Sequence, residues 1–214
     1  IHIYSKIALK IMRVKVLVRA AGVSSRNCLM VCNHMSYLDM IVLASVNPSV
    51  FVTSVDMGEV FFLGTMAELG GALFVERRNR ERIEFDIAQI RHSLTQGLDV
   101  TLFPEGTSGN GQGVLPFKRS LLTAALEAGV PVLPVTLKYF EIDGEAFSEE
   151  NHEAVCWYGH ARFLPHFFKM LSLKSIRAKV VYGSPVRNRP GMTKESLSND
   201  LYQTISREYS VLGV

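Results

Sequence analysis

The sequence predicts a single α/β domain, residues 1–214, with a largely parallel, mixed sheet flanked by helices. Short apolar runs alternate with longer segments of helical periodicity, which is the pattern of strand–helix–strand units. The 214 residues suit one domain with a sizeable core, and no repeat or convincing interdomain linker divides them. Hydrophobic residues make up 48% and charged residues 20%, a balance that excludes a disordered chain.

The first segment, residues 1–18, is predicted to be an amphipathic helix with a basic flank. Its apolar residues recur at nearly four-residue spacing among four basic ones, as in a helix. The apolar positions are Ile3, Ile7, Ile11 and Val14, and the basic ones are Lys6, Lys10, Arg13 and Lys15. Such a helix either lies on an anionic membrane surface or packs on the domain. From Val14 to Arg19 the alternation also suits a strand, which leaves the end of the helix open.

Strands and helices then follow in alternation. Six short apolar runs are predicted as strands. They are Cys28–Cys32, Val50–Val55, Ala72–Val75, Asp99–Phe103, Val130–Leu137 and Lys179–Tyr182. Helices are predicted from after His34 to about Ala44, at Phe61–Leu69, Arg80–Gln96 and about Lys118–Ala128, and around Leu197, Leu201 and Ile205. Gly97 and Gly129 are well placed to end two of these helices.

Charge and cysteine content narrow the class of protein only a little. The net charge of +3 permits an anionic partner but identifies none, and no nucleic acid partner is expected. The three cysteines, Cys28, Cys32 and Cys156, lack the spacing of a disulfide framework or a zinc site. We therefore expect buried structural thiols in a reducing compartment.

No stretch is typical of a transmembrane helix. The longest uncharged run, from Met40 to Val55, is interrupted by Asn47-Pro48 and is short for a span. Because the chain begins at Ile1, the presence of an anchor upstream of it stays open.

The first candidate for chemistry is the pair His34 and Asp39. A histidine at the end of a buried strand, with an aspartate five residues later at the start of a helix, can bring imidazole and carboxylate together across the turn. The carboxylate would hold one ring nitrogen protonated and leave the other as a general base for a hydroxyl group. Taken alone the spacing is weak evidence, and a structural histidine is the alternative.

Two further clusters follow strands. Residues 103–109, Phe-Pro-Glu-Gly-Thr-Ser-Gly, come after an apolar strand, at an edge where open α/β sheets bind ligands. The glycines leave backbone N–H groups accessible to an anion, and Glu105 is placed where a polar headgroup could lie. Residues 71–78 form an apolar strand that ends in two arginines, whose guanidinium groups suit a phosphate. The alternatives are a glycine-rich connecting loop and a surface charge cluster.

Together with a fourth block, these clusters resemble the glycerolipid acyltransferases, the family of lysophosphatidic acid acyltransferases. Residues 33–39, Asn-His-Met-Ser-Tyr-Leu-Asp, resemble the family's NHxxxxD motif. Gly71–Arg77 resembles its second block, Phe103–Thr107 reproduces its FPEGT block, and Val130–Val135 resembles its apolar fourth block. The likeness covers roughly Leu29 to Leu137, and four blocks in family order are a strong signal.

The resemblance implies an O-acyltransferase that moves a fatty acyl group from acyl-CoA or acyl carrier protein to a lysophospholipid such as 1-acylglycerol 3-phosphate, in phospholipid biosynthesis or remodelling. His34 would be the catalytic base and Asp39 its orienting partner. The substrate-binding residues would be Arg77, Glu105, Gly106 and Thr107, while Val130–Val135 would help to shape the acyl-chain environment. No metal and no other cofactor is implied. We expect association with a membrane surface, facing the cytoplasm, either peripherally or through a segment missing from this chain.

One departure from the family pattern concerns the acceptor. Many members have arginine after the FPEGT threonine, where this chain has Ser108. The absence of this guanidinium group, which could bind a phosphate, weakens the case for a glycerol 3-phosphate-type acceptor. Another lysolipid, including an amino-acid lipid, stays open as the acceptor. Lys118 and Arg78 are candidates to compensate. Two other classes remain as alternatives: a non-catalytic lipid-binding protein, and a thioesterase that hands the acyl group to water.

Residues 152–171 combine three histidines with several aromatic side chains. The histidines, His152, His160 and His166, match no metal-ligand spacing. We expect the aromatic residues either to pack in the core or to form a surface that faces lipid or lines the acyl chain.

Overall fold

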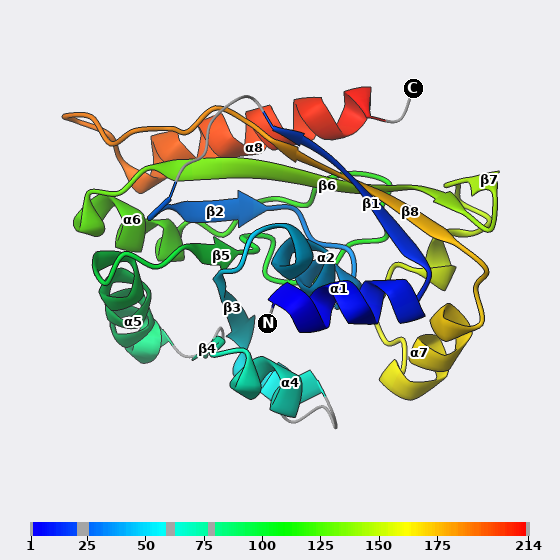
Figure 1. Cartoon of the computed structure of the whole chain (residues 1–214). Coiled ribbons are helices and arrows are strands. Elements are labelled where there is room, and N and C mark those ends of the chain that lie inside the picture. Colours follow the sequence, from blue (N-terminus) through cyan, green and yellow to red (C-terminus); the bar gives the residue numbers. More distant parts are fainter. Residues whose placement is uncertain (1, 21–25, 59–62, 77–79, 213–214) are drawn as a thin grey trace.

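The computed structural model describes residues 2–20, 26–58, 63–76 and 80–212. Within them the chain forms an eight-stranded sheet in which seven strands follow the order β1-β8-β6-β2-β5-β3-β4 and β7 pairs with β6 (Figure 1). The strands are β1 (Val14–Ala20), β2 (Leu29–Cys32), β3 (Val50–Ser54), β4 (Leu73–Val75), β5 (Val100–Leu102), β6 (Val132–Ile142), β7 (Glu145–Ala146) and β8 (Ile176–Tyr182). Strand β6 runs antiparallel to β7 and β8, and the other pairs are parallel. The predicted mixed, largely parallel sheet is confirmed.

Helices cover both faces of this sheet (Figure 1). They are α1 (His2–Ile11), α2 (Leu38–Val46), α3 (Val55–Gly58), α4 (Leu63–Leu69), α5 (Ile83–Thr95), α6 (Thr123–Ala128), α7 (Phe163–Leu171) and α8 (Lys194–Val211), with 3-10 turns at Arg80–Arg82, Ser120–Leu122 and His152–Ala154. Gly129 ends α6 in the left-handed conformation, with φ +67°. Glycine adopts this conformation without the steric cost that a Cβ atom brings.

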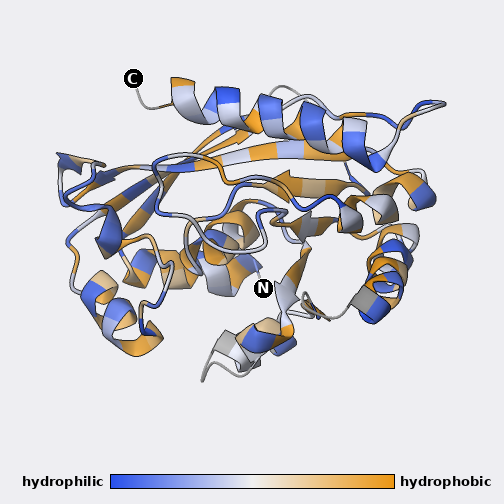
Figure 2. Ribbon diagram, turned by 180° about the vertical axis from the view of Figure 1, so that it is seen from behind, coloured by the Kyte–Doolittle hydropathy of each residue, from blue (hydrophilic) through white to orange (hydrophobic). Residues whose placement is uncertain are grey.

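The core consists of two apolar clusters. One packs α1, α2 and α7 against the sheet, and the other packs α5, α6 and α8 against it. Helix α8 lies across the face of the sheet opposite α1 and α2 (Figure 1), and the strands between them are mainly apolar (Figure 2). Coverage on both faces explains why the central strands are continuous apolar runs in the sequence, and β2 is buried at all four positions.

The N-terminal segment differs from the prediction of one helix over residues 1–18. The helix ends at Ile11, and the chain then forms strand β1, so the strand alternative for Val14–Arg19 is the one adopted. The reason is tertiary: β1 pairs in parallel with β8 along its whole length, from Val14 beside Ile176 to Ala20 beside Tyr182. Pairing across the sheet therefore overrides the helical spacing that continues past Ile11.

Helix α7 and strand β7 are absent from the predicted elements. Helix α7 contains Pro165, which reads as a helix breaker in the sequence. Proline is tolerated there because it lies in the first turn, where backbone N–H groups have no partner within the helix. None of the described helices is both long and apolar enough to cross a membrane.

Candidate active site

The carboxyl ends of three parallel strands bring the candidate residues together. Strand β2 ends at Cys32 just before His34, and β5 ends at Leu102 just before Phe103. Strand β3 ends at Ser54, beside the same cavity. This is the edge at which open α/β sheets bind ligands, so the order of the strands in the sheet brings these segments, distant in the sequence, to one place.

His34 and Asp39 form the predicted pair. His34 Nδ1 lies 2.9 Å from Asp39 Oδ2, and the aspartate side chain, in the first turn of α2, is fully buried. We assign the proton to Nδ1, because a carboxylate oxygen only accepts hydrogen bonds. This tautomer leaves Nε2 with a free lone pair, as a general base requires.

Backbone groups and a distant tyrosine fix the carboxylate of Asp39. Its Oδ2 also accepts hydrogen bonds from the backbone N–H groups of Met35, at 2.6 Å, and Ser36, at 2.9 Å. Its Oδ1 accepts a hydrogen bond of 2.6 Å from the hydroxyl of Tyr139, a fully buried residue of β6. Both oxygens are thus held, and the orientation of the imidazole follows from that of the carboxylate.

Two neighbours restrain the His34 segment further. The ring of Phe103 stacks on the imidazole, with ring centroids 4.2 Å apart and planes 20° apart. Asn33 forms two hydrogen bonds with the backbone of Leu137: its Nδ2 donates to the carbonyl oxygen at 2.8 Å, and its Oδ1 accepts from the N–H at 2.9 Å. The asparagine side chain thereby continues the pairing of β2 with β6 beyond Cys32.

Glu105 joins three segments of the site. Its Oε1 accepts a hydrogen bond of 2.8 Å from the His34 N–H, and its Oε2 accepts one of 3.0 Å from the Leu115 N–H. The residue is only 3% exposed. The sequence suggests direct contact between this carboxyl group and a headgroup, whereas the structure shows both oxygens bonded to backbone amides. Glu105 is therefore a positioning residue here, and its contact with a substrate stays a prediction.

His34 lines a cavity of about 420 Å³. The described residues around it come from the three strand ends, α2, α3, the loop after β5 and the segment before α7: His34, Tyr37, Met40, Val52, Thr53, Ser54, Asp56, Met57, Phe103, Gly106, Thr107, Ser108, Lys118 and Trp157. A second cavity of about 400 Å³ shares Val52, Phe103, Gly106 and Lys118 with it, and the rest of its wall mixes apolar side chains with Glu76, Asp86, Arg119 and Ser120. Polar groups beside His34, together with the apolar side chains in the walls of both cavities, suit a substrate with a polar head and an acyl chain.

Two of the four predicted substrate-binding residues, Gly106 and Thr107, lie in the wall of this cavity. Gly106 has φ +72°, and the side chain of Lys118 passes directly over its α-carbon, where a Cβ atom would lie 2.8 Å from Nζ. A larger residue at this position would therefore displace the lysine. Arg77, the fourth predicted residue, and Arg78 lie outside the described residues.

Ser108 contributes an uncharged hydroxyl group to the cavity wall. Its hydroxyl donates a hydrogen bond to the backbone carbonyl of Trp157. Within the described part of the wall, Lys118 is the one Lys or Arg side chain. The apolar block Val130–Val135 does not line either cavity; it enters the centre of the sheet as the start of β6.

Sequence reasoning missed Tyr139, whereas Trp157, in the cavity wall, belongs to the aromatic residues of segment 152–171 that were expected either to pack in the core or to line the acyl chain. Tyr139 lies 100 positions after Asp39 and beyond the fourth block, so no local pattern connects the two. The packing interpretation of the histidine-rich segment holds for two of its histidines, which are buried. His166 Nδ1 bonds the hydroxyl of Tyr37 at 2.9 Å, and His152 Nε2 bonds that of Tyr158 at 3.1 Å.

The three cysteines are buried and unbridged. Burial raises the pKa of the Cys32 and Cys156 thiols, which keeps both protonated and poorly nucleophilic. Among the residues that the structure describes, no group of three or more His, Cys, Asp or Glu side chains is arranged to hold a metal ion.

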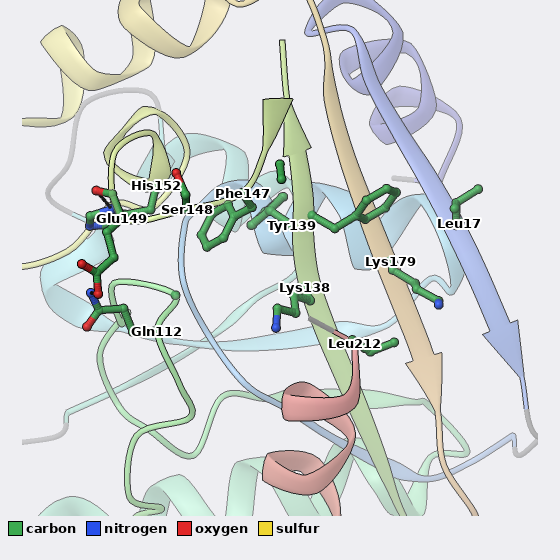
Figure 3. Close-up of a pocket in the computed structure, with 13 residues that line it drawn as sticks. Leu17, Gln112, Lys138, Tyr139, Phe147, Ser148, Glu149, His152, Lys179 and Leu212 are labelled. Carbon is green, nitrogen blue, oxygen red and sulfur yellow. Dashed lines mark hydrogen bonds between the residues drawn. The ribbon is translucent and has the colours of Figure 1, made fainter. Parts of the chain in front are cut away.

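A further cavity, of about 580 Å³, does not include His34 and lies on the side of the sheet near the end of α8 (Figure 3). Lys138 and Lys179, neighbours on β6 and β8, contribute to its wall. Tyr139 also belongs to this wall, although its hydroxyl bonds Asp39. His34 and Asp39 are not part of this cavity.

Fold and site together define an α/β domain that presents a histidine–aspartate pair for acid–base chemistry. The chain belongs to the acyltransferase family: the family model described as "Acyltransferase" matches residues 13–138. The resemblance carried by the four sequence blocks is thereby confirmed.

Two curated relatives illustrate the range of the family. The chain is 33% identical over 178 residues to a lyso-ornithine lipid O-acyltransferase of Brucella abortus, covering 79% of this chain and 67% of the relative. It is 31% identical over 163 residues to a 1-acyl-sn-glycerol-3-phosphate acyltransferase of Neisseria gonorrhoeae, covering 76% of this chain and 61% of the relative. The chain thus spans about two thirds or less of the length of these two relatives.

A solved structure supports the fold. The crystal structure of the 1-acyl-sn-glycerophosphate (LPA) acyltransferase PlsC from Thermotoga maritima matches with a TM-score of 0.72. The match covers 99% of this chain and 77% of the other, at 20% sequence identity. At this identity the likeness establishes the architecture.

The first prediction concerns the buried carboxyl group of Glu105. Burial raises its pKa from 4.5 to about 8, in spite of two backbone hydrogen bonds that lower it. The folded protein therefore keeps a proton that the unfolded chain loses, and stability falls as the pH rises from about 4.5 to about 8. In Glu105→Gln this part of the pH dependence should disappear. Urea unfolding at several pH values measures it, and Glu150→Gln, at an exposed site, should keep the wild-type slope. A wild-type slope in Glu105→Gln would contradict the prediction.

The second prediction concerns Tyr139. Tyr139→Phe removes the hydrogen bond to Asp39 Oδ1, and we expect kcat to fall about tenfold while KM changes little, because the imidazole loses orientation without losing substrate contacts. Steady-state kinetics of acyl transfer provide the measurement. Tyr182→Phe is the matched control, since Tyr182 is buried and its hydroxyl has no partner among the described residues. Equal kcat values for the two variants would exclude a positioning role.

Proposed function

We propose that this domain transfers a fatty acyl group from a thioester to the hydroxyl of a lysolipid, with His34 as the general base. The observation that carries the proposal is the bond of His34 Nδ1 to the buried Asp39, with His34 in the wall of a cavity that adjoins a second one. Membership in the acyltransferase family supports the reaction class. The expected donor is acyl-CoA or acyl carrier protein, and the proposed chemistry uses no metal or other cofactor.

The proposed reaction is a direct attack. His34 Nε2 takes the proton of the acceptor hydroxyl as its oxygen attacks the thioester carbonyl carbon. The resulting tetrahedral intermediate collapses with cleavage of the C–S bond, and the thiolate takes the proton back from the imidazolium. Asp39 stabilises the transient positive charge, and its four hydrogen-bonded contacts hold the ring in place without rearrangement during the reaction.

A lysophospholipid such as 1-acylglycerol 3-phosphate is the first candidate acceptor. The name of the Neisseria relative supports it, and Arg77, Gly106 and Thr107 are proposed to bind the headgroup. A lyso-ornithine lipid is the second candidate. Ser108, which replaces the arginine of many family members, favours it together with the name of the Brucella relative. An acceptor with fewer negative charges needs fewer cations in the cavity.

We also propose that the domain works at a membrane surface that faces the cytoplasm. The acceptor is an amphiphile that resides in a bilayer, and α1 carries exposed apolar residues beside lysines. Three unbridged cysteines are in keeping with a reducing compartment.

The third prediction tests catalysis. His34→Ala should lower the rate of diacyl product formation from acyl-CoA and a lysolipid by about 10²–10⁴-fold, the usual contribution of a general base. Mass spectrometry of product and thiol release are the two readouts. His92→Ala, at an exposed position on α5, is the control.

Each alternative function gives a different result in that assay. A lipid-binding protein forms no product in the wild type. A thioesterase releases thiol at the same rate with and without the lysolipid. Wild-type turnover in His34→Ala would remove this residue from the mechanism.

The fourth prediction addresses the acceptor. Ser108→Arg adds the guanidinium that many family members carry, and we expect it to raise kcat/KM for 1-acylglycerol 3-phosphate relative to lyso-ornithine lipid by about tenfold, the value of one added charged hydrogen bond. Ser108→Ala removes the bond to Trp157 without adding charge, so its ratio should stay near that of the wild type. A ratio in Ser108→Arg equal to that in Ser108→Ala would exclude position 108 from acceptor selection.

A further inference from the structure

The last turn of helix α8 reaches the candidate active site from a distant part of the sequence. Tyr209, in this turn, is only 4% exposed, and its hydroxyl donates a hydrogen bond of 2.6 Å to the carbonyl oxygen of Gly111. The same hydroxyl lies 3.3 Å from the sulfur of Met35. Gly111 belongs to the loop after β5, and Met35 belongs to the turn between β2 and α2. One side chain therefore contacts two of the segments that build the site.

The loop after β5, residues 103–119, depends on individual contacts for its position. It forms no helix or strand before the 3-10 turn at Ser120–Leu122. Without a ladder of backbone hydrogen bonds, the separate bonds that its groups make determine where such a segment lies. Three of its residues, Gly106, Thr107 and Ser108, form part of the cavity wall beside His34. The position of this loop therefore decides the shape of the cavity.

The loop is also bonded to the turn that carries His34. The Gly109 N–H donates a hydrogen bond of 2.9 Å to the carbonyl oxygen of His34. In the turn, the Met35 N–H donates one of 2.6 Å to Asp39 Oδ2. Tyr209 contacts the loop two residues after Gly109 and contacts the turn at Met35 itself. A shift of the loop would therefore be transmitted both to the cavity wall and to the backbone that holds the imidazole.

Tyr209 is itself held by two strands of the sheet. The ammonium group of Lys138, on β6, donates a hydrogen bond of 3.0 Å to the Tyr209 carbonyl oxygen and lies 4.4 Å from the centre of its ring. Figure 3 shows this lysine beside the end of α8. Glu208 pairs with Arg19 of β1. Burial raises the pKa of Tyr209 well above its usual range, so the hydroxyl keeps the proton that it donates.

Strand β6 links this contact to the hydrogen bond between Tyr139 and Asp39. Consecutive residues of a strand point to opposite faces of the sheet. Tyr139 therefore reaches Asp39 from one face, while Lys138 holds Tyr209 on the other. The two tyrosines restrain different groups, because Tyr139 bonds the carboxylate whereas Tyr209 bonds the loop. Their loss should accordingly have different kinetic effects.

We propose that Tyr209 is a positioning residue for acyl transfer, which fixes the loop after β5 and the His34 turn relative to each other through Gly111 and Met35. This inference rests on the proposed function, since it gives Tyr209 a part in that reaction. Tyr209 is not among the described residues that line either cavity at the site, so it acts through its neighbours. Because the loop provides part of the proposed headgroup site, Tyr209 supports both acceptor binding and turnover.

The test is Tyr209→Phe, which keeps the ring beside Lys138 and removes only the hydroxyl. We expect kcat/KM for the lysolipid to fall about fivefold, the value of one net hydrogen bond, through a rise in KM as well as a fall in kcat. Tyr139→Phe, by contrast, should leave KM nearly unchanged. Hydrogen–deuterium exchange provides a readout without substrate. Amides of residues 107–113 should exchange faster in Tyr209→Phe, while those of β8 keep the wild-type rates.

Tyr202→Phe is the matched control on the same helix. The Tyr202 hydroxyl lies 3.4 Å from the carbonyl oxygen of Val114, which is long for such a hydrogen bond, and Val114 lines neither cavity at the site. This variant should keep the wild-type KM and exchange rates. Lys138→Met leaves the Tyr209 hydroxyl in place but removes its support, so it should raise KM by about twofold. It provides a second test if Tyr209→Phe does not fold.

Several outcomes would overturn the inference. These are a wild-type KM in Tyr209→Phe, wild-type exchange of residues 107–113, and an equal rise of KM in Tyr202→Phe. Faster exchange in β8 together with an unchanged KM would show that the hydroxyl only stabilises the fold. An inactive wild type would refute the proposed function itself, whereas an active wild type with unchanged kinetics in Tyr209→Phe would refute this inference alone.

Discussion

The candidate site depends on the hydrogen bonds that hold the buried carboxylate of Asp39. A buried carboxylate is costly unless its oxygens are satisfied, and here an imidazole, two backbone N–H groups and a tyrosine hydroxyl satisfy them. The same four contacts determine the conformation of the turn between β2 and α2. They also tie that turn to β6 through Tyr139. The geometry of the His34–Asp39 pair and local folding are therefore one constraint, because the turn that satisfies the carboxylate also orients the imidazole.

The parallel sheet explains how few residues are needed to build this arrangement. Strands β2, β5 and β3 are neighbours in the sheet. Their carboxyl ends therefore place His34, Phe103 and Ser54 around one cavity, and the strand order alone accounts for this. Glu105 then fastens two of the loops that leave this edge, by accepting from the His34 and Leu115 amides. Its acidic side chain therefore serves as a brace between loops, and a glutamate in such a motif does not by itself indicate contact with substrate.

Local sequence carried the information for the pair and for most elements. His34 and Asp39 are close in the chain, their spacing spans one strand-to-helix turn, and the apolar runs around them are long enough to define strands. The hydrogen bond of Tyr139 to Asp39 could not be predicted from local sequence, because it joins positions 100 residues apart. The burial of Glu105 was missed for a similar reason, since it depends on loops that meet only in the fold. For the residues after Ile11 the sequence left helix and strand open from Val14 to Arg19, and pairing with β8 decided for the strand.

The position of the site beside α1 has a consequence for how a lipid acceptor could reach it. The axes of packed helices lie about 8–10 Å apart. Helix α2 is therefore separated by the width of one helix from the exposed apolar side chains of α1, which are Ile3, Tyr4, Ile7 and Ile11. A lysolipid has a headgroup that tolerates water and a chain that does not, and leaving the bilayer entirely would expose that chain at about 0.8 kcal/mol per CH₂ group. With the domain at a membrane surface, the acceptor hydroxyl would approach His34 while part of its chain stays in the bilayer and part lies along the apolar side chains of the second cavity, among them Val75, Leu102 and Phe117. The exposed apolar side of α1 and the proposed catalytic pair, in which His34 precedes α2 and Asp39 lies in its first turn, would then serve the same reaction. The first would lower the cost of extracting the acceptor, and the second would activate its oxygen.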